Sequence, residues 1–537
     1  MSTEKTDVLV IGTGFGGAIP AFHLAAGGAK VLMLERGPWL DTSDLSQDYQ
    51  LGTYTRILDL VMGTGVEVIA GNCVGGSSVV YLAASMRAPT FVFERKANGV
   101  SQWPASVTRG SLDPWYDIVE ENLPVAQQPW NEVSYSGGLW AGACARAGGT
   151  CNPVPVAVNL SQCGRCGWMA TGCVYGAKRS MLTNYLPAAV SAGAEIRPLH
   201  EVQFIGPAAS PGYRYAVNYL TINPDDYRAQ TGGGVIEAKV VVCAAGALGT
   251  PVILKRSAQA LGSIPNAVGR YFSPNGDHVS LALFNEDKVK ELLGLERAPG
   301  VPYAAHSIGR SIGTTSFDQL DPSLPEGLRY ALQQIYYPPI VNLMPEDGVE
   351  GDPVWFGADK KELSKKWPSW MSVLAMVEDE NEGVFGTPPP TGNFTRLASA
   401  ASLAQLTYKP SERTLAARAD ADVKVRSIVE QDGLGSFLEW KQTENSLSAH
   451  PLASCRMGDD PAISALDDHN ELRGHPGLFV TDGSAVPTSL CVNPSITIAA
   501  LAERAAPFIA QSAQAAGISV DYSEDRRPGS GQLHRPR

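Results

Sequence analysis

Residues 7–37 read DVLVIGTGFGGAIPAFHLAAGGAKVLMLERG, and this stretch decides the fold of the N-terminal part of the chain. An apolar run of strand length at 8–11 leads into G-T-G-F-G-G, which satisfies the pattern G-x-G-x-x-G. A helical pattern then runs to Ala26, and the apolar run 31–34 predicts a second strand that ends in Glu35. Strand, glycine turn, helix, strand and acid therefore occur in the order of a dinucleotide-binding unit.

Each part of this unit has a physical role. Gly12 permits the tight turn, Gly14 lets the backbone approach a pyrophosphate, and Gly17 lets the helix pack closely on the strand. The start of the helix offers N–H groups and a positive dipole end to phosphates. Glu35 lies where an acid is expected to bind ribose hydroxyls, although the motif alone does not separate FAD from NAD. We predict that the cofactor contacts Gly12, Gly14, Phe15, Gly16, Gly17, Glu35 and Arg36.

Composition sets outer limits on the function. The 537 residues are 44% hydrophobic and 18% charged, which is typical of a globular protein of two domains. The net charge of −12 argues against a nucleic-acid partner. No apolar run approaches the ~20 residues that span a bilayer, so we expect no transmembrane segment. The N-terminal residues MSTEKTD resemble no secretory signal, and nine cysteines suit reduced thiols, so we expect a cytoplasmic location.

A second glycine-rich stretch, GNCVGGSSVVY at 71–81, carries three glycines and two serines between apolar flanks. Such composition is typical of a backbone that lies against a ligand, and the alternative is a flexible surface loop. The apolar flanks favour a loop that is pinned in place. Between the two glycine stretches, residues 54–61 are consistent with a helix.

The remaining chain alternates between two kinds of sequence pattern. Residues 235–249 and 478–484 repeat the pattern of a strand that runs into glycine, and a helix is expected over 497–511. Residues 277–445 show strand-like runs separated by Pro/Gly loops, which indicates a β-rich substrate domain. We predict an α/β protein in which a Rossmann-like dinucleotide-binding domain is interleaved with a β-rich α+β domain. The expected boundaries are 1–95, 188–276 and 446–520 for the first domain, 96–187 and 277–445 for the second, and a disordered tail at 521–537.

Three cysteines lie close together in the sequence. Cys163 and Cys166 have C-x-x-C spacing, and Cys173 follows. These side chains are of the type that ligates a metal or an iron–sulfur cluster, but the set is short of four good ligands. Buried or free thiols are the favoured alternative, so we predict no metal.

Six segments, in order, resemble the glucose–methanol–choline (GMC) oxidoreductase family, and within it the bacterial cholesterol oxidase type. The resemblance covers the nucleotide-binding part almost completely and the substrate part in patches. The last two segments are the most specific, because they join His-Pro-Leu to Thr-Asp-Gly-Ser and Val-Asn-Pro. The segments are VLVIGTGFGGA (8–18), GNCVGGSSVVY (71–81), GAKRSMLTNYLPAAVSAGAEIRPLHEV (176–202), VVVCAAGALGTPVIL (240–254), AHPLASCRMG (449–458) and LFVTDGSAVPTSLCVNPSITIAALAER (478–504).

The resemblance implies a bound FAD and oxidation of an alcohol to a ketone by hydride transfer to flavin N5. It pairs His450 with Asn493 opposite substrate and flavin. A neutral imidazole can accept the hydroxyl proton, and an amide supplies a fixed dipole. The implied substrate is a hydrophobic, cyclic secondary alcohol, steroid-like or similar, with molecular oxygen or another electron acceptor. The further cofactor contacts implied are Gly71, Gly75, Gly76, Ser77, Ser78, Val202, Ala245, Gly246, Asp482, Gly483, Asn493 and Pro494.

One departure from the family pattern concerns a glutamate. In cholesterol oxidases a glutamate of the substrate domain moves a proton during isomerisation of the steroid ketone. The local match here carries Gln334, with Tyr336 nearby as a second weak candidate for substrate binding. Because an amide cannot act as a general base, this implies oxidation without isomerisation or a different alcohol. The alternatives are a sugar, glycoside or primary-alcohol oxidase of the same family, a lyase-type protein with a structural flavin, and a nucleotide-binding module without catalysis.

Overall fold

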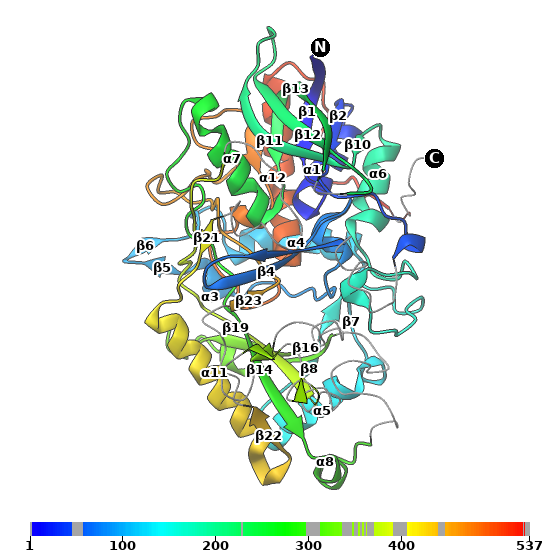
Figure 1. The fold of residues 1–537 in the computed structure, drawn as a ribbon, viewed down its shortest axis with the longest axis vertical. Coiled ribbons are helices and arrows are strands. Elements are labelled where there is room, and N and C mark those ends of the chain that lie inside the picture. Colours follow the sequence, from blue (N-terminus) through cyan, green and yellow to red (C-terminus); the bar gives the residue numbers. More distant parts are fainter. Residues whose placement is uncertain are drawn as a thin grey trace.

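The computed structural model describes most of the chain, and the description below rests on that part alone. The described residues are 3–45, 57–226, 229–296, 312–335, 346–347, 353–354, 357–358, 361, 370–389, 405–438, 446–529 and 531. Two large sheets dominate them. They lie toward opposite ends of the longest axis, with a small three-stranded sheet between them (Figure 1).

The first large sheet carries the nucleotide-binding pattern. Its strands run in the order β10-β2-β1-β13-β12-β11, and β24 also pairs with β13. β1 is parallel to both β2 and β13, and its residues 8–11 are buried on both faces, as expected for a parallel sheet covered by helices. The strands are β1 (Glu4–Ile11), β2 (Val31–Leu34), β10 (Glu195–Arg197), β11 (His200–Pro207), β12 (Tyr215–Ile222), β13 (Gln230–Cys243) and β24 (Leu478–Val480). The associated helices are α1 (Phe15–Ala26), α6 (Tyr185–Ser191), α7 (Gly246–Leu261) and α12 (Ser495–Ala515).

The second large sheet is antiparallel and has the order β22-β14-β19-β16-β15-β8. Its strands are β8 (Asn152–Pro153), β14 (Asp277–Phe284), β15 (Ile312–Ser316), β16 (Tyr330–Ile335), β19 (Trp370–Val377) and β22 (Gly435–Leu438). Three helices pack beside it, and the longest of them runs along one side of the sheet in Figure 1: α5 (Tyr135–Arg146), α8 (Glu286–Leu293) and α11 (Glu412–Glu430). The predicted fold class, a Rossmann-like domain interleaved with a β-rich α+β part, is confirmed. The domain boundaries stay predictions.

The expected helix over 54–61 is wrong for residues 58–61, whereas residue 57 is helical and residues 54–56 lie outside the described residues. Leu58–Met62 forms strand β3, which pairs with β4 (Val66–Gly71), and β4 pairs with β23 (Ser446–Ser448). Alternate residues of β3 are buried, which is the period of a half-buried strand. The remaining elements are α3 (Thr90–Phe93), α4 (Arg109–Asn122), β5 (Lys96–Ala97), β6 (Val100–Ser101), β7 (Ala126–Gln127), β9 (Pro155–Val156), β17 (Glu346–Asp347), β18 (Pro353–Val354), β20 (Val384–Phe385) and β21 (Leu406–Thr407).

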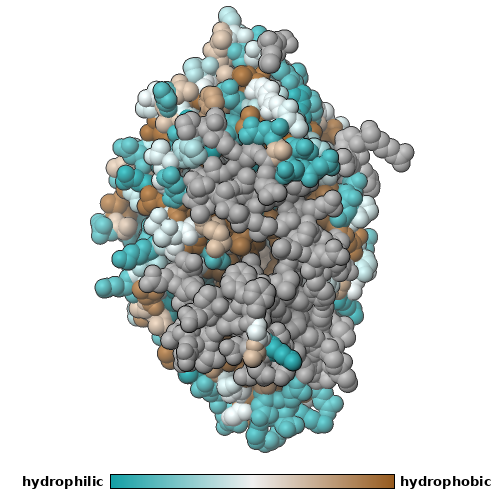
Figure 2. Space-filling model, in the orientation of Figure 1, coloured by the Kyte–Doolittle hydropathy of each residue, from teal (hydrophilic) through white to brown (hydrophobic). Residues whose placement is uncertain are grey.

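The structure describes residues 521–529 and 531 of the C-terminal segment that we expected to be disordered, and the first of these residues contact α1 and the residue after it. The N–H of Asp521 donates to the carbonyl of Gly27 (2.9 Å), and the ring of Tyr522 lies against that of His23. On the face drawn in Figure 2, hydrophilic side chains crowd the lower end of the molecule and hydrophobic ones emerge near mid-height. Within the described ranges, no helix combines the length and apolar character needed to cross a membrane.

Candidate functional site

The turn between β1 and α1 is built as the glycine pattern requires. Gly12 has φ +96°, and a Cβ there would lie 2.2 Å from the carbonyl oxygen of Ala244. A Cβ on Gly17 would lie 2.0 Å from the carbonyl oxygen of Gly12, and one on Gly16 would lie 2.5 Å from that of Thr481. A Cβ on Gly14 would meet nothing within 4 Å. Gly12, Gly16 and Gly17 are therefore too close to other backbone atoms to carry a side chain. The space beside Gly14 is open, and this is where a pyrophosphate is expected.

Glu35 connects this turn to the second glycine loop. Its carboxylate accepts hydrogen bonds from the N–H (3.1 Å) and hydroxyl (2.7 Å) of Thr13 and from the N–H of Gly37 (2.9 Å). The Thr13 hydroxyl in turn accepts from the N–H of Gly75 (2.9 Å). A Cβ on Gly76 would lie 3.0 Å from the Cα of Gly14. The two glycine stretches, far apart in sequence, thus form one continuous cradle. Burial raises the pKa of Glu35.

The hydroxyls of the second glycine loop bind the protein itself. Ser77 accepts from the N–H of Gly71 (2.9 Å). Ser78 donates to the carbonyl of Gly75 (2.6 Å) and accepts from the N–H of Met181 (3.0 Å). The loop is therefore held by its own hydroxyls, as its apolar flanks led us to expect. Beyond it, the ring of Tyr81 meets that of Phe15 edge to face, 5.6 Å between centroids.

Asp482 joins the C-terminal segment to α7. One carboxylate oxygen accepts from the N–H of Gly246 (2.8 Å) and the hydroxyl of Thr250 (2.5 Å), and the other accepts from the N–H and hydroxyl of Ser484. Both oxygens are fully used within the protein. Any contact with a cofactor here is therefore expected from backbone groups. Burial raises the pKa of this carboxyl.

The other expected cofactor contacts lie around the same edge of the sheet. Arg36 forms an ion pair with Asp59 of β3. Val202 is buried on β11, two residues after His200, whose N–H donates to the carbonyl of Glu35 (2.8 Å). Three further positions are fixed by the backbone around them: Ala245, whose N–H donates to Thr250, Gly483, which packs against the carbonyl of Pro451, and Pro494, which precedes α12.

The structure brings His450 and Asn493 together. The Nδ2 of Asn493 lies 3.2 Å from the Nε2 of His450. On the other side of the ring, Nδ1 lies 2.9 Å from a carboxylate oxygen of Asp277, the first residue of β14. The second oxygen of Asp277 accepts from Ser448 (2.9 Å) and from the N–H of Ala449 (3.3 Å). An ionised Asp277 is an acceptor only, so it assigns the proton to Nδ1 and leaves Nε2 as the basic atom.

The sequence analysis did not identify Asp277, and it also missed Gln333 on β16. Its amide exchanges hydrogen bonds with that of Asn493: Gln333 donates to Asn493 Oδ1 (3.1 Å), and Asn493 donates to Gln333 Oε1 (3.3 Å). Gln333 also donates to the hydroxyl of Thr315 (3.0 Å). Because Oδ1 of Asn493 receives this bond, its NH₂ group is the one directed to His450. The site is a chain of Asp277, His450, Asn493 and Gln333.

Gln334, the residue we expected at the substrate, points away from this chain. Its amide oxygen accepts from the N–H of Gly313 (3.2 Å) and its NH₂ donates to the carbonyl of Ile335 (3.0 Å). Successive residues of a strand point to opposite faces, so Gln334 and its neighbour Gln333 cannot both face Asn493; the role of Gln334 in substrate binding stays a prediction. Tyr336 lies outside the described residues.

Comparison with known proteins identifies the family of this chain. The family model described as GMC oxidoreductase matches residues 7–275 with its N-terminal part and 391–502 with its C-terminal part. The chain belongs to the GMC oxidoreductase family. A cholesterol oxidase of Mycobacterium tuberculosis is 25% identical to it, over 98% of this chain and 94% of that protein. A long-chain-alcohol oxidase of Arabidopsis thaliana is 27% identical, over 92% of this chain and 66% of that protein.

Solved structures agree on the fold. Pyridoxine 4-oxidase from Mesorbium loti has a TM-score of 0.64 at 17% identity, covering 94% of this chain and 99% of the other. A fungal aryl-alcohol oxidase has a TM-score of 0.62 at 15% identity, covering 95% and 99%. GMC oxidoreductases are flavoproteins that typically bind FAD. The predicted family and enzyme class, a flavin-dependent alcohol oxidoreductase, are confirmed.

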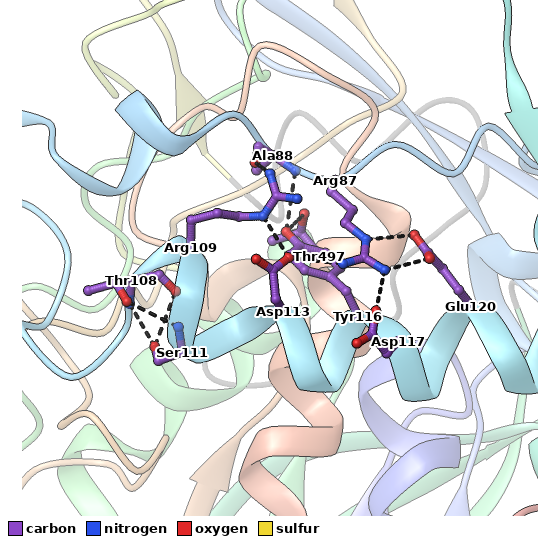
Figure 3. Close-up of polar contacts among 10 residues, drawn as sticks. All are labelled: Arg87, Ala88, Thr108, Arg109, Ser111, Asp113, Tyr116, Asp117, Glu120 and Thr497. Atoms are coloured by element: carbon purple, nitrogen blue, oxygen red, sulfur yellow. Dashed lines mark hydrogen bonds and ion pairs between the residues drawn. The ribbon is translucent and has the colours of Figure 1, made fainter.

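In this GMC oxidoreductase the helix that follows Asn493 is anchored by α4 (Figure 3). The hydroxyl of Tyr116 lies 2.7 Å from that of Thr497, in the first turn of α12, and accepts from the N–H of Ala88 (3.3 Å). The guanidinium groups of Arg87 and Arg109 lie over the Tyr116 ring at 5.3 and 5.6 Å. No acidic residue occupies the first turn of α12. The positive end of the helix dipole therefore lies next to Asn493, and no acidic side chain in that turn neutralises it.

The three clustered cysteines lie close to the second glycine loop. Cys163, Cys166 and Cys173 are half-buried free thiols that line one small hollow together with Lys178. Among the described residues, no three His, Cys, Asp or Glu side chains converge in a way that could hold a metal ion.

Proposed function

We propose that this GMC oxidoreductase uses bound FAD to oxidise a hydrophobic alcohol, a cyclic secondary alcohol in the first instance, to the ketone. The observation that carries the proposal is the chain of hydrogen bonds from Asp277 through His450 to Asn493 and Gln333. It provides one basic nitrogen held between a carboxylate and an oriented amide. Such an arrangement suits removal of a hydroxyl proton.

The residues of the cradle fit FAD. Gly14 is open to a pyrophosphate, and α1 begins there without a side-chain cap or an acid in its first turn. Glu35 directly follows β2, where its carboxylate can also accept from ribose hydroxyls. The Gly75–Ser78 loop is fixed against Gly14 and would lie along the flavin. When bound, FAD supplies the acceptor for the hydride that leaves the alcohol carbon.

His450 acts on the alcohol hydroxyl. Its Nε2 accepts the proton, and the resulting imidazolium is stabilised by Asp277 at Nδ1, 2.9 Å away. Asn493 holds the ring from the Nε2 side, until the substrate hydroxyl takes the place of its N–H at that nitrogen. Gln333 keeps the Asn493 amide in that orientation.

The substrate class rests on the relatives and on Gln333. Both curated relatives carry names of oxidases that act on apolar alcohols, a sterol in one case and long-chain alcohols in the other. The residue of β16 that meets Asn493 is an amide, so it cannot serve as the proton-transferring carboxylate of steroid isomerisation. We therefore propose oxidation without isomerisation.

The test is an anaerobic visible spectrum of the purified protein before and after addition of a sterol, a terpene alcohol, a long-chain primary alcohol and a glycoside. Bleaching of the flavin by the sterol or terpene alcohol supports the proposal. Bleaching by the long-chain alcohol or the glycoside alone would replace the substrate class, and a flavin that none of them bleaches would favour a structural flavin.

The variant His450→Asn tests the assignment of the base. We expect flavin reduction to slow about 10²-fold or more with FAD still bound, since general-base catalysis contributes that much. His469→Asn is the matched control, because His469 is half exposed and stacks on Phe508 at the surface. Equal rates in His450→Asn and the control would remove His450 from the mechanism.

A further inference from the structure

The proposed catalytic site joins two segments that are far apart in the sequence, and one buried amide ties them together. Asp277 begins β14, whereas Asn493 lies two residues before α12. Asn275 donates from Nδ2 to the carbonyl oxygen of Val492 (3.0 Å), and its Oδ1 accepts from the N–H of Leu490 (2.7 Å). The carbonyl of Val492 belongs to the peptide bond that leads into Asn493. The two bonds of the Asn275 amide therefore clamp the backbone of Asn493 to the segment that precedes β14.

The turn that carries Asn275 is itself held in place. Asn275 is fully buried and has φ +57°, in the left-handed region that asparagine adopts more readily than most residues. Its N–H donates to the hydroxyl of Ser273 (2.9 Å). The next residue, Gly276, donates its N–H to the carboxylate of Asp379 (2.9 Å), and a Cβ on it would lie 2.0 Å from the carbonyl oxygen of Val377. The amide is thus presented by a backbone that is fixed on both sides.

The segment that the Asn275 amide binds is strained. Cys491 lies between Leu490 and Val492, is fully buried, and has φ +58°. Such a conformation is unfavourable for a residue with a Cβ, and it persists only where the surrounding contacts enforce it. The two bonds of the Asn275 amide supply such contacts on either side of Cys491. Loss of the amide would therefore let this segment relax, and Asn493 would move with it.

We propose that Asn275 is a positioning residue, which holds the Asn493 amide beside His450 by binding the peptide that leads into Asn493. The inference rests on the proposed function, from which the roles of His450 and Asn493 come. In the wild type the Nδ2 of Asn493 lies 3.2 Å from Nε2 of His450. A displacement of about 1 Å near the reacting atoms can slow a reaction about 10²-fold. Asn275→Gly still permits the left-handed backbone and removes the amide, so we expect flavin reduction to slow by about 10- to 10²-fold.

Asn470→Gly is the matched control. Asn470 is also fully buried, has φ +68°, and donates from Nδ2 to a carbonyl oxygen, that of Val480 (2.9 Å). Both variants lose the same kind of bond, but only Asn275→Gly loses it at the backbone next to Asn493. Rates are measured per bound flavin by anaerobic stopped flow, with an alcohol that bleaches the wild-type flavin. We expect the control to retain the wild-type rate even if its Tm falls.

A double-mutant cycle with Asn493→Ala separates positioning from a general loosening of the fold. If Asn275 acts through Asn493, then Asn275→Gly should cause no further loss of rate in the Asn493→Ala background. An equal loss in both backgrounds would overturn the proposal. Asn275→Ala removes the same amide, and it takes the place of Asn275→Gly in the cycle if the glycine variant does not fold.

Crystal structures of the wild type and the two glycine variants provide a readout that needs no substrate. We expect Asn275→Gly to show the Asn493 amide displaced from Nε2 of His450, and Asn470→Gly to keep that contact. An Asn493 amide that stays in place in Asn275→Gly would overturn the proposal. A wild-type flavin that no alcohol bleaches would count against the proposed function instead, and the crystal structures would still decide whether Asn275 positions Asn493.

Discussion

Asp277 is the residue on which the proposed base depends. Its carboxylate lies 2.9 Å from His450 Nδ1 and is 2% exposed, so little solvent competes for it. We predict that Asp277→Asn lowers the rate of flavin reduction by about 10²-fold, because the imidazolium loses its counter-charge while the substrate contacts remain. The measurement is stopped-flow flavin reduction over a range of substrate concentrations, where kcat should fall with little change in apparent substrate binding.

Ser448→Ala supplies the comparison for Asp277→Asn. It removes the hydrogen bond to the other carboxylate oxygen and the one that the hydroxyl accepts from the N–H of His450 (3.0 Å), and it leaves the charge in place. Its effect should be about 10-fold, the size expected for ordinary neutral hydrogen bonds. A rate for Asp277→Asn within the range of Ser448→Ala would contradict a role for the charge.

Gln333 and Gln334 allow a test within one strand. Gln333→Met removes the partner of the Asn493 amide, and we predict a fall in kcat of about 10-fold because the amide is no longer held toward His450. Gln334→Met makes the same chemical change on the opposite face and should alter kcat much less, although it can reduce stability. Steady-state rates and thermal unfolding of both variants separate the two effects. Equal losses of kcat would mean that Gln333 acts only through packing.

The sequence indicated some of these residues and not others, for physical reasons. His450 and Asn493 stand in short motifs whose spacing is specific, and the structure brings them within 3.2 Å. Asp277 follows a turn and starts an apolar strand, where an acid has many possible roles. Two adjacent glutamines occur in β16, and only the orientation of the strand decides that Gln333 rather than Gln334 contacts Asn493. The sequence does not give this orientation, because a shift of one residue moves every side chain of a strand to the opposite face.

At the scale of elements, the position of α12 depends on a buried contact with α4. Tyr116 and Thr497 are both fully buried, and their hydroxyls lie 2.7 Å apart (Figure 3). We predict that Tyr116→Phe destabilises the protein by about 1–3 kcal/mol, because it leaves the Thr497 hydroxyl and the Ala88 N–H without this partner. Thermal unfolding should show a lower apparent Tm. Tyr175→Phe, at an exposed tyrosine, should leave the Tm unchanged, and equal Tm values for both variants would contradict the anchor.

Elements with a strong local pattern were predictable, and those defined by distant partners were not. The apolar runs 8–11 and 31–34 form β1 and β2 as expected, since parallel central strands are apolar throughout. The run 58–62 has too few residues to distinguish a helix from a strand by period. Its pairing with β4, which in turn pairs with β23 nearly 400 positions along the chain, decides the outcome.

At the scale of the whole molecule, buried charges join segments that sequence reasoning could not place together. Arg95, which follows α3, donates to the hydroxyl of Ser489 (2.7 Å) and to the carbonyl of Asp379 (2.5 Å). The Asp379 carboxylate accepts from the hydroxyl of Ser273 (2.6 Å) and the N–H of Gly276 (2.9 Å), directly before Asp277. Four stretches of chain, around residues 95, 273–276, 379 and 489, thus meet behind the proposed base, and nothing in their local patterns indicates the contact.

Asp379 makes this meeting point sensitive to pH. Burial, and then the carboxylate of Glu382, raises the pKa of Asp379 from 3.8 to about 7. Between these values the folded protein binds a proton that the unfolded chain has released, so the contribution of Asp379 to stability is complete below pH 3.8 and is lost as the pH rises through 7. Its slope is at most about 1.4 kcal/mol per pH unit.

Asp379→Asn carries a neutral side chain at every pH and resembles the protonated acid. We therefore predict that the wild type loses stability relative to Asp379→Asn as the pH is raised from 5 to 8. Urea unfolding of both proteins at each pH measures the difference, in which titrations common to both proteins cancel. A difference that stays constant over this range would mean that Asp379 is already ionised at pH 5, and that the neighbouring arginine and N–H groups compensate for its burial.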